Sequence, residues 1–269
     1  MADRHRIEAR LRDKLNRFLK RPGPLRVAAE TLKTWDSRGW GPILFGGVIR
    51  DFVVLGRRRY PRDVDIVLQR GDLSAVANGL ESTEYHFNRF GGLHLNIERW
   101  VFDVWLLEKT WAFTVDSSLH PTADELPKTT FLDAEAVAVT FEQGRVSEIY
   151  SNGFFECVAS RRIDINYEPN PFPSLNAVRA ILTAHKLAFA ISPRLAKYYL
   201  ETLATYGPHS MIDAQERHYQ KVILDTTALC DIERHLQTVT SKVQPADRVY
   251  LPAYMHPKQL QLWTEQVDK

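Results

Sequence analysis

The chain has 269 residues, of which 44% are hydrophobic and 25% are charged, and these fractions exclude a disordered, collagen-like or coiled-coil protein. Its 35 Lys and Arg residues nearly balance 33 Asp and Glu residues, and the net charge of +2 argues against a protein that coats nucleic acid over its whole surface. The two cysteines lie far apart in the sequence and form no metal-ligand pair, so we expect a reduced, cytoplasmic protein. No apolar run approaches the roughly 18–20 residues of a membrane span and the N-terminus has no apolar signal segment, so we expect no membrane partner.

The first 21 residues predict a basic amphipathic helix that ends at Pro22-Gly23-Pro24. They contain eight Lys and Arg residues against three acids, while Ile7, Leu11, Leu15 and Phe18 recur at helical spacing. The apolar stripe favours packing against the rest of the protein, and the basic face favours contact with nucleic acid. We expect packing to be the main role.

Between residues 25 and 68 the sequence predicts alternating helices and strands. We expect a helix over 25–37, a short buried strand at 43–45, a tight turn at Gly46-Gly47, a helix over 48–55 and a strand over 63–68. The segment before this last strand is a basic loop with Arg57, Arg58, Arg59 and Arg62. The sequence leaves two roles open for this loop: it attracts a polyanion, or it only increases the solubility of the protein.

The rest of the chain changes from mixed structure to helices. We expect a helix over 72–81, strands near 84–90, 92–98 and 100–107, a hairpin of 136–141 with 145–150, and helices over 174–189, 193–206 and 210–236. The front half is therefore mixed in secondary structure, and the back half is helical. The tail after residue 240 carries exposed-looking aromatic residues, among them Tyr250, Tyr254 and Trp263.

The turn at Gly46-Gly47 and the pair Asp63 and Asp65 are the residues that indicate chemistry. A strand that ends in two glycines and runs into a helix presents backbone N–H groups at the helix N-terminus, where they suit a phosphate. Two carboxylates at positions i and i+2 share one face of a strand and repel each other unless a cation lies between them. Mg²⁺ prefers such oxygen ligands and keeps part of its shell for water and phosphate. Together these features predict metal-assisted phosphoryl or nucleotidyl transfer.

The same residues carry a resemblance to a known superfamily. The run from Gly46 to Gly56, followed by Asp63-Val64-Asp65-Ile66-Val67, resembles the head domain of the polymerase-β-type nucleotidyltransferases. Within that superfamily it is most similar to bacterial CCA-adding enzymes and poly(A) polymerases, whose motif is Gly-Gly-x-Val-Arg-Asp-x-Leu-Leu-Gly leading to Asp-x-Asp. About ten positions agree in type and order across a strand–helix–strand unit.

The resemblance continues along roughly residues 25–205. Phe90-Gly91-Gly92-Leu93 and Phe102-Asp103-Val104-Trp105 are similar to the hairpin whose second strand supplies the third carboxylate, and Asp103 is the matching residue. The segment from Asn176 to Ile181, continuing to Phe189, is similar to the helical neck that contacts nucleotide.

This resemblance implies a fold and a domain organisation. The implied fold class is α+β, a nucleotidyltransferase palm with a mixed antiparallel sheet and helices on one face, followed by an all-helical domain. The implied divisions are a basic helix at 1–22, a catalytic head at 23–170, a helical neck at 171–239 and a tail at 240–269.

The resemblance also implies a two-metal nucleotidyl transfer with two Mg²⁺ ions, or Mn²⁺ in their place, and a nucleoside triphosphate and an RNA or oligonucleotide acceptor as partners. In this scheme Asp63, Asp65 and Asp103 are the catalytic and metal-binding residues. The residues assigned to the nucleotide are Gly46, Gly47, Arg50, Arg62, Arg179 and Lys186. Asp51 is expected to brace Arg50 rather than to bind metal.

Some family features are missing from this chain. The sugar- and base-reading segment of the family has two arginines and an asparagine before the hairpin, whereas here the arginines are missing and Glu135 stands near the asparagine position. Base and sugar therefore stay open, and so do acceptor and oligomeric state. One alternative function is a defence- or toxin-type enzyme that makes a nucleotide signal or modifies an RNA or a protein, with Tyr250 or Tyr254 as a protein primer. Another is a non-catalytic nucleotide- or RNA-binding module.

Overall fold

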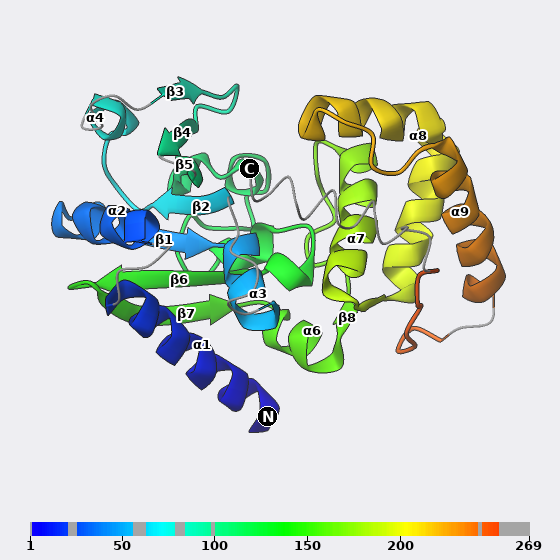
Figure 1. Cartoon of the computed structure of the whole chain (residues 1–269), viewed down its shortest axis with the longest axis horizontal. Coiled ribbons are helices and arrows are strands. Elements are labelled where there is room, and N and C mark those ends of the chain that lie inside the picture. Colours follow the sequence, from blue (N-terminus) through cyan, green and yellow to red (C-terminus); the bar gives the residue numbers. More distant parts are fainter. Residues whose placement is uncertain are drawn as a thin grey trace. The chain divides into compact units, whose positions relative to one another are not determined.

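The computed structural model describes residues 2–20, 26–55, 63–78, 84–97, 100–241 and 244–252. The chain divides into two compact units, Met1–Ala159 and Ser160–Lys269, and each is described by itself below (Figure 1). The basic loop at 57–62, the turn at 22–24, and Tyr254 and Trp263 in the tail lie outside the described residues. The four-part division expected from the sequence stays a prediction.

A seven-stranded mixed sheet forms the centre of the first unit. The strands follow the order β3-β4-β5-β2-β1-β6-β7 across the sheet. β2 and β5 run parallel, and the other neighbouring strands pair antiparallel. The expected mixed sheet and the hairpin between β6 and β7 are thereby confirmed. The strands are β1 (Pro42–Phe45), β2 (Asp63–Leu68), β3 (Glu84–Phe87), β4 (Leu93–Ile97), β5 (Trp100–Leu106), β6 (Val137–Glu142) and β7 (Arg145–Ser151).

Helices cover one face of this sheet, as expected (Figure 1). They share a large apolar core with inward residues of the strands, among them Val64, Ile66 and Phe102, all of which are almost fully buried. Strand alternation explains this arrangement, because every second side chain of a strand points to the same face. The helices that contribute to this core are α1 (Ala2–Lys20), α2 (Arg26–Ser37), α3 (Gly47–Val54), α4 (Leu73–Asn78) and α6 (Phe154–Ser160).

The opposite face of the sheet carries a smaller apolar cluster at one end. Phe45, Val67 and Ala138 belong to it, together with Leu107 and Leu126 from the connection between β5 and β6. This connection consists of short turns of helix: η2 (Leu107–Lys109), α5 (Trp111–Val115), η3 (Leu126–Thr129) and η4 (Asp133–Glu135). On β2, Val67 lies two residues after Asp65 and four residues after Asp63. Because every second side chain of a strand points to the same face, both aspartates project from this second face.

The N-terminal helix α1 packs on the first unit through its apolar stripe. Leu11 and Leu15 are fully buried, and Leu19 is nearly so. Two basic side chains also bond to the unit, since Arg12 Nη1 donates to the carbonyl of Ser147 at 2.6 Å and Lys14 Nζ donates to the carbonyl of Phe52 at 3.1 Å. Burial and neighbouring arginines lower the pKa of Lys14. The expected packing role of this helix is confirmed.

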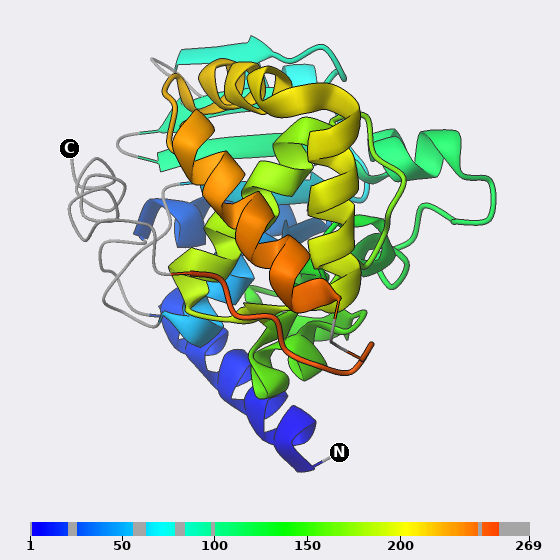
Figure 2. The ribbon, with the colours of Figure 1, turned by 90° about the vertical axis from the view of Figure 1, so that its right-hand side faces the viewer.

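The second unit is mostly helical, as expected (Figure 2). A short parallel pair of strands, one before and one after α7, belongs to it. Ser192, the N-cap of α8, accepts a hydrogen bond from the N–H of Leu195 at 3.0 Å. No helix within the described residues is long and apolar enough to cross a membrane. The elements are β8 (Arg162–Ile163), α7 (Pro173–Leu187), β9 (Ala190–Ile191), α8 (Pro193–Tyr219) and α9 (Thr226–Thr240).

The expected single helix over 210–236 is wrong. Its first part is continuous with α8, which kinks at Gly207 (φ 73°, ψ 166°) and ends at Tyr219, and α9 begins only at Thr226. The buried side chain of Gln215 holds the intervening turn, because its Oε1 accepts from the N–H groups of Ile223 and Leu224 at 3.0 and 2.8 Å. Asp225 then caps α9 through the N–H of Ala228 at 2.8 Å. Apolar periodicity continues across the break and therefore conceals it.

Candidate active site

The turn between β1 and α3 is built around Gly46. Its backbone angles (φ 68°, ψ −130°) are accessible essentially to glycine alone, and its N–H donates to the carbonyl of Val137 on β6 at 3.0 Å. α3 begins at the next residue, Gly47. The first N–H groups of a helix have no partner within the helix, and this turn therefore presents donors suited to an anion.

Asp63, Asp65 and Asp103 lie on one face of the sheet. Asp65 on β2 stands directly beside Asp103 in the parallel register with β5, and Asp63 lies two residues earlier on β2. Asp63 is exposed, while Asp65 and Asp103 are half-buried. The structure thus brings these three predicted residues to the same face of two neighbouring strands.

The glycine turn is adjacent to these acids. A methyl group placed on Gly46 would lie 3.8 Å from Asp65 Oδ2 and 3.9 Å from the carbonyl oxygen of Glu135. Asp65 also pairs with Phe45, the residue that precedes Gly46 at the end of β1. A phosphate held at the turn would therefore lie close to the carboxylate of Asp65.

The three acids fit a divalent cation by residue type and by strand register. Carboxylate oxygens are the ligands that Mg²⁺ prefers, and adjacent strands lie about 4.8 Å apart, which is close enough for Asp65 and Asp103 to share an ion. No three His, Cys, Asp or Glu side chains of the described residues are already gathered around a common metal position. The three acids therefore fit a divalent cation through the chemistry of their carboxylate oxygens and through the placement of their backbones on the two strands.

Arg50 is buried in an ion-pair network beside the turn. Its Nε donates to Asp51 Oδ1 at 2.9 Å, which confirms the expected contact, and its Nη1 donates to Glu135 Oε1 at 2.6 Å. Burial alone would lower the pKa of the guanidinium, but the two carboxylates outweigh it, and the pKa of Arg50 lies above its ordinary value. Its Nη2 lies 3.3 Å from the position that a methyl group on Gly47 would take, so this end of the side chain faces the turn.

Two contacts of the site were not expected from the sequence, one of Arg50 and one of Asp103. Glu135 and Arg50 are 85 residues apart in the sequence, and no local sequence pattern indicates that they pair. His94 on β4 contacts Asp103, with 2.8 Å between His94 Nδ1 and Asp103 Oδ1. The register of the β4–β5 hairpin, in which Ile97 stands opposite Trp100, is the signal that places His94 opposite Asp103.

The remaining predicted nucleotide-binding residues lie elsewhere in the chain. Arg179 and Lys186 belong to the second unit, half-buried and two turns apart on α7, and hence on one side of that helix. Arg62 lies outside the described residues.

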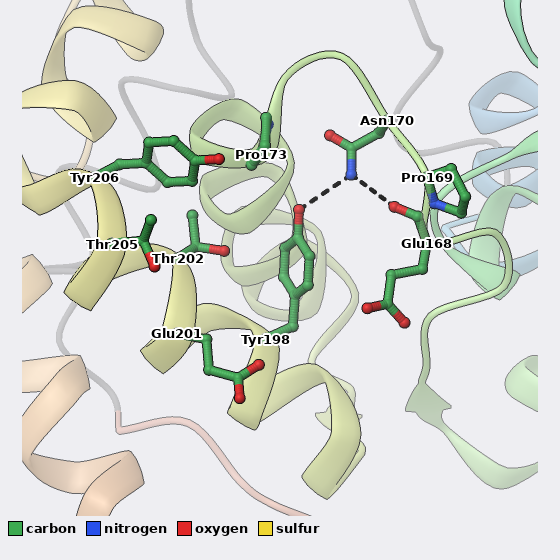
Figure 3. A pocket seen from close by; sticks show the side chains of 9 residues that line it. All are labelled: Glu168, Pro169, Asn170, Pro173, Tyr198, Glu201, Thr202, Thr205 and Tyr206. Carbon is green, nitrogen blue, oxygen red and sulfur yellow. Dashed lines mark hydrogen bonds between the residues drawn. The ribbon is translucent and has the colours of Figure 1, made fainter. Parts of the chain in front are cut away.

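A separate cavity of about 360 Å³ lies within the second unit (Figure 3). Asn170 braces its wall, because its Nδ2 donates to the Tyr198 hydroxyl at 3.1 Å and to the carbonyl of Glu168 at 2.8 Å. Burial raises the pKa of the Tyr198 phenol. The cavity contains none of the residues that the sequence singled out. Its lining consists of Glu168, Pro169, Asn170, Pro173, Tyr198, Glu201, Thr202, Thr205 and Tyr206.

Comparison with solved structures identifies the fold class. The chain shares its fold with solved tRNA-processing enzymes, CCA-adding enzymes and tRNA nucleotidyltransferases, to which it is similar at low sequence identity. No family model matches the sequence, and no curated protein matches it.

Three of these structures illustrate the similarity. A tRNA-processing enzyme in an apo form has 18% identity and a TM-score of 0.57, with 90% of this chain and 62% of that chain covered. A CCA-adding enzyme in complex with CTP has 14% identity and a TM-score of 0.58, with 82% and 54% covered. A tRNA nucleotidyltransferase complexed with a primer tRNA and an incoming ATP analogue has 17% identity and a TM-score of 0.53, with 79% and 62% covered. The chain thus spans between 54% and 62% of the length of these three proteins.

Proposed function

We propose that this protein is a template-independent nucleotidyltransferase. It transfers a nucleoside monophosphate from a nucleoside triphosphate to a hydroxyl group, at the 3′ end of an RNA or oligonucleotide, and releases pyrophosphate. The observation that carries the proposal is the position of Asp63, Asp65 and Asp103 on one face of β2 and β5, beside the glycine turn that leads into α3.

The residues of the site have distinct roles in this proposal. The N–H groups after Gly46 and Gly47 bind the triphosphate, and the Nη2 of Arg50 supports it from beside the turn. Asp63, Asp65 and Asp103 hold the divalent cations and orient the acceptor hydroxyl towards the α-phosphorus. When bound, the two Mg²⁺ ions supply charge neutralisation for the attacking and leaving oxygens.

The similar structures support the substrate classes. Their descriptions include CTP, an ATP analogue and a primer tRNA, which favours a nucleoside triphosphate and a nucleic-acid acceptor for this chain. In the second unit, Arg179 and Lys186 are candidates for contacts to the triphosphate or the base. The missing reading arginines and the presence of Glu135 leave base and sugar to experiment.

Replacement of one acid tests the enzymatic assignment. We expect Asp65→Asn to lower turnover by at least about 10³-fold, because the variant loses several kcal/mol of charge stabilisation in the transition state. Pyrophosphate release would be measured with Mg²⁺, each ribo- and deoxyribonucleoside triphosphate, and a mixture of RNA acceptors. Glu142→Gln, which changes an exposed acid at the end of β6, is the matched control and should retain full turnover. Pyrophosphate release that is equal in Asp65→Asn and wild type would contradict the enzymatic assignment of this site, and no release by either protein would favour a non-catalytic binding module.

A second acceptor is favoured by one observation. Tyr250 is 64% exposed, and its hydroxyl is therefore accessible as a primer on the protein itself. The same assay without RNA separates the two functions. Label on the protein, lost in Tyr250→Phe, or a free nucleotide oligomer would contradict the RNA acceptor, whereas strict dependence on RNA would contradict the protein-primed and signal-making functions.

A further inference from the structure

His94 lies next to the third carboxylate of the site, and the mechanism above does not use it. The Nδ1 of His94 and the Oδ1 of Asp103 are 2.8 Å apart, and because a carboxylate only accepts, the Nδ1–H is the donor. The two residues are direct partners in the antiparallel register of β4 and β5, so the backbone itself brings the side chains together.

The imidazole of His94 is itself held in place. Its neighbours on β4, Leu93 and Leu95, are fully buried on the opposite face and fix the strand. On its other side, His86 from β3 is its partner in the sheet, and the centroids of the two rings are 4.7 Å apart with 37° between the ring planes. His94 is therefore packed between His86 and Asp103, and its side chain is 27% exposed.

The side chain of Asp103 is supported by this contact with His94. Its side chain is 40% exposed, and within the described part of the chain His94 is its hydrogen-bond partner. An aspartate on a strand can turn about its side-chain bonds. A hydrogen bond to one oxygen restricts that rotation and leaves the other oxygen to act as a ligand.

We propose that His94 is a positioning residue that orients the carboxylate of Asp103 for binding a divalent cation, with the tilted ring of His86 packed behind it as a support. This inference rests on the proposed function. Residues that hydrogen-bond to metal-binding side chains typically change metal affinity or activity by about 10–100-fold when they are replaced. The row His86, His94, Asp103 and Asp65 thus extends the site across four neighbouring strands.

Binding of Mn²⁺ to the full chain, measured without nucleotide by the electron paramagnetic resonance signal of free Mn²⁺, tests the role of His94. We expect His94→Leu to weaken Mn²⁺ binding by at least about tenfold, because the donor to Asp103 is lost. His94→Asn keeps an N–H near the Nδ1 position and should remain within about threefold of wild type. His94→Gln extends its amide to the Nε2 position instead and should also weaken Mn²⁺ binding by at least about tenfold. This variant tests the same contact if the leucine variant fails to fold.

Two further variants complete the design. His86→Leu removes the imidazole ring packed against His94 and should weaken Mn²⁺ binding by about threefold. His120→Leu changes an exposed histidine elsewhere in the same unit and should have no effect. In turnover assays, His94→Leu should lower kcat, with partial recovery at high Mn²⁺, and should leave the KM for the nucleoside triphosphate nearly unchanged.

The outcomes separate this inference from the proposed function. The role of His94 would be overturned if His94→Leu and His94→Gln both bind Mn²⁺ with wild-type affinity. It would also be overturned if His94→Asn loses as much Mn²⁺ affinity as His94→Gln. If Asp65→Asn nevertheless abolishes turnover, the proposed function stands without it. If Asp65→Asn retains turnover, the proposed function fails, whatever the affinity of the His94 variants.

Discussion

Two groups of acidic residues in the first unit, Asp51 with Glu135 and Asp63 with Asp103, differ in their surroundings. Asp51 is buried and Glu135 half-buried against the guanidinium of Arg50, and their charges are compensated by direct hydrogen bonds. Asp63 and Asp103 lie at the accessible face of the sheet, where a cation from solution can reach them. A buried charge must have a partner within the protein, whereas an accessible acid can bind an external one.

This comparison separates structural acids from candidate catalytic ones. The resemblance of the sequence already implies different roles, since Asp51 is expected to brace Arg50 and Asp63 to bind metal. Burial distinguishes them, since the side chain of Asp51 is almost inaccessible and that of Asp63 is exposed. The predictions below test whether this difference in burial is also a difference in function.

The largest expected effect concerns stability. Asp51→Asn leaves the buried guanidinium of Arg50 with one carboxylate instead of two and should lower the free energy of unfolding by about 3 kcal/mol. Asp63→Asn, at the accessible face, should change it by less than about 1 kcal/mol while abolishing turnover. Urea titrations of both variants, monitored by circular dichroism, give the comparison. A larger loss of stability in Asp63→Asn would contradict the division into structural and catalytic acids.

The glycine turn lies between the two groups and should affect both stability and activity. Gly46→Ala forces alanine into a backbone conformation that favours glycine and should cost about 2 kcal/mol of stability. It should also lower turnover by at least about tenfold, because the phosphate-binding N–H groups shift. Gly39→Ala is the matched control, with a φ of 73° and open space around the added methyl group. It should lose about 1 kcal/mol and keep its turnover.

The smallest expected effect concerns a histidine with a buried ring nitrogen and no ionic partner within the described part of the chain. Burial lowers the pKa of His185 on α7, whose Nε2 is buried and has no hydrogen-bond partner among the described residues. Below the ordinary histidine pKa of about 6.5, the unfolded chain takes up a proton that the folded chain does not, so this group lowers stability as the pH falls. His185→Gln removes that contribution. Urea titrations at pH 7.5 and 5.5 should therefore show a smaller loss of stability in the variant than in wild type, and an equal loss would contradict the prediction.

Much of the fold was predictable because its signals are local. Alternation of Val64, Ile66 and Leu68 with acids indicated a strand with one buried face, and that face is the one covered by helices. The turn at Gly46 was predictable from two glycines between a buried strand and a helix. The break before α9 was not, because it depends on hydrogen bonds from the buried side chain of Gln215 rather than on a change of apolar period.

The candidate site divides in the same way. The sequence by itself determined that Asp63 and Asp65 share a strand face and that a glycine turn precedes them, since both follow from spacing along one short segment. Only the tertiary structure decided that Asp103 stands beside Asp65, that His94 bonds to Asp103 and that Glu135 compensates Arg50. These contacts join segments that are distant in the sequence, and strand register and burial, which are properties of the whole unit, determine which residues meet.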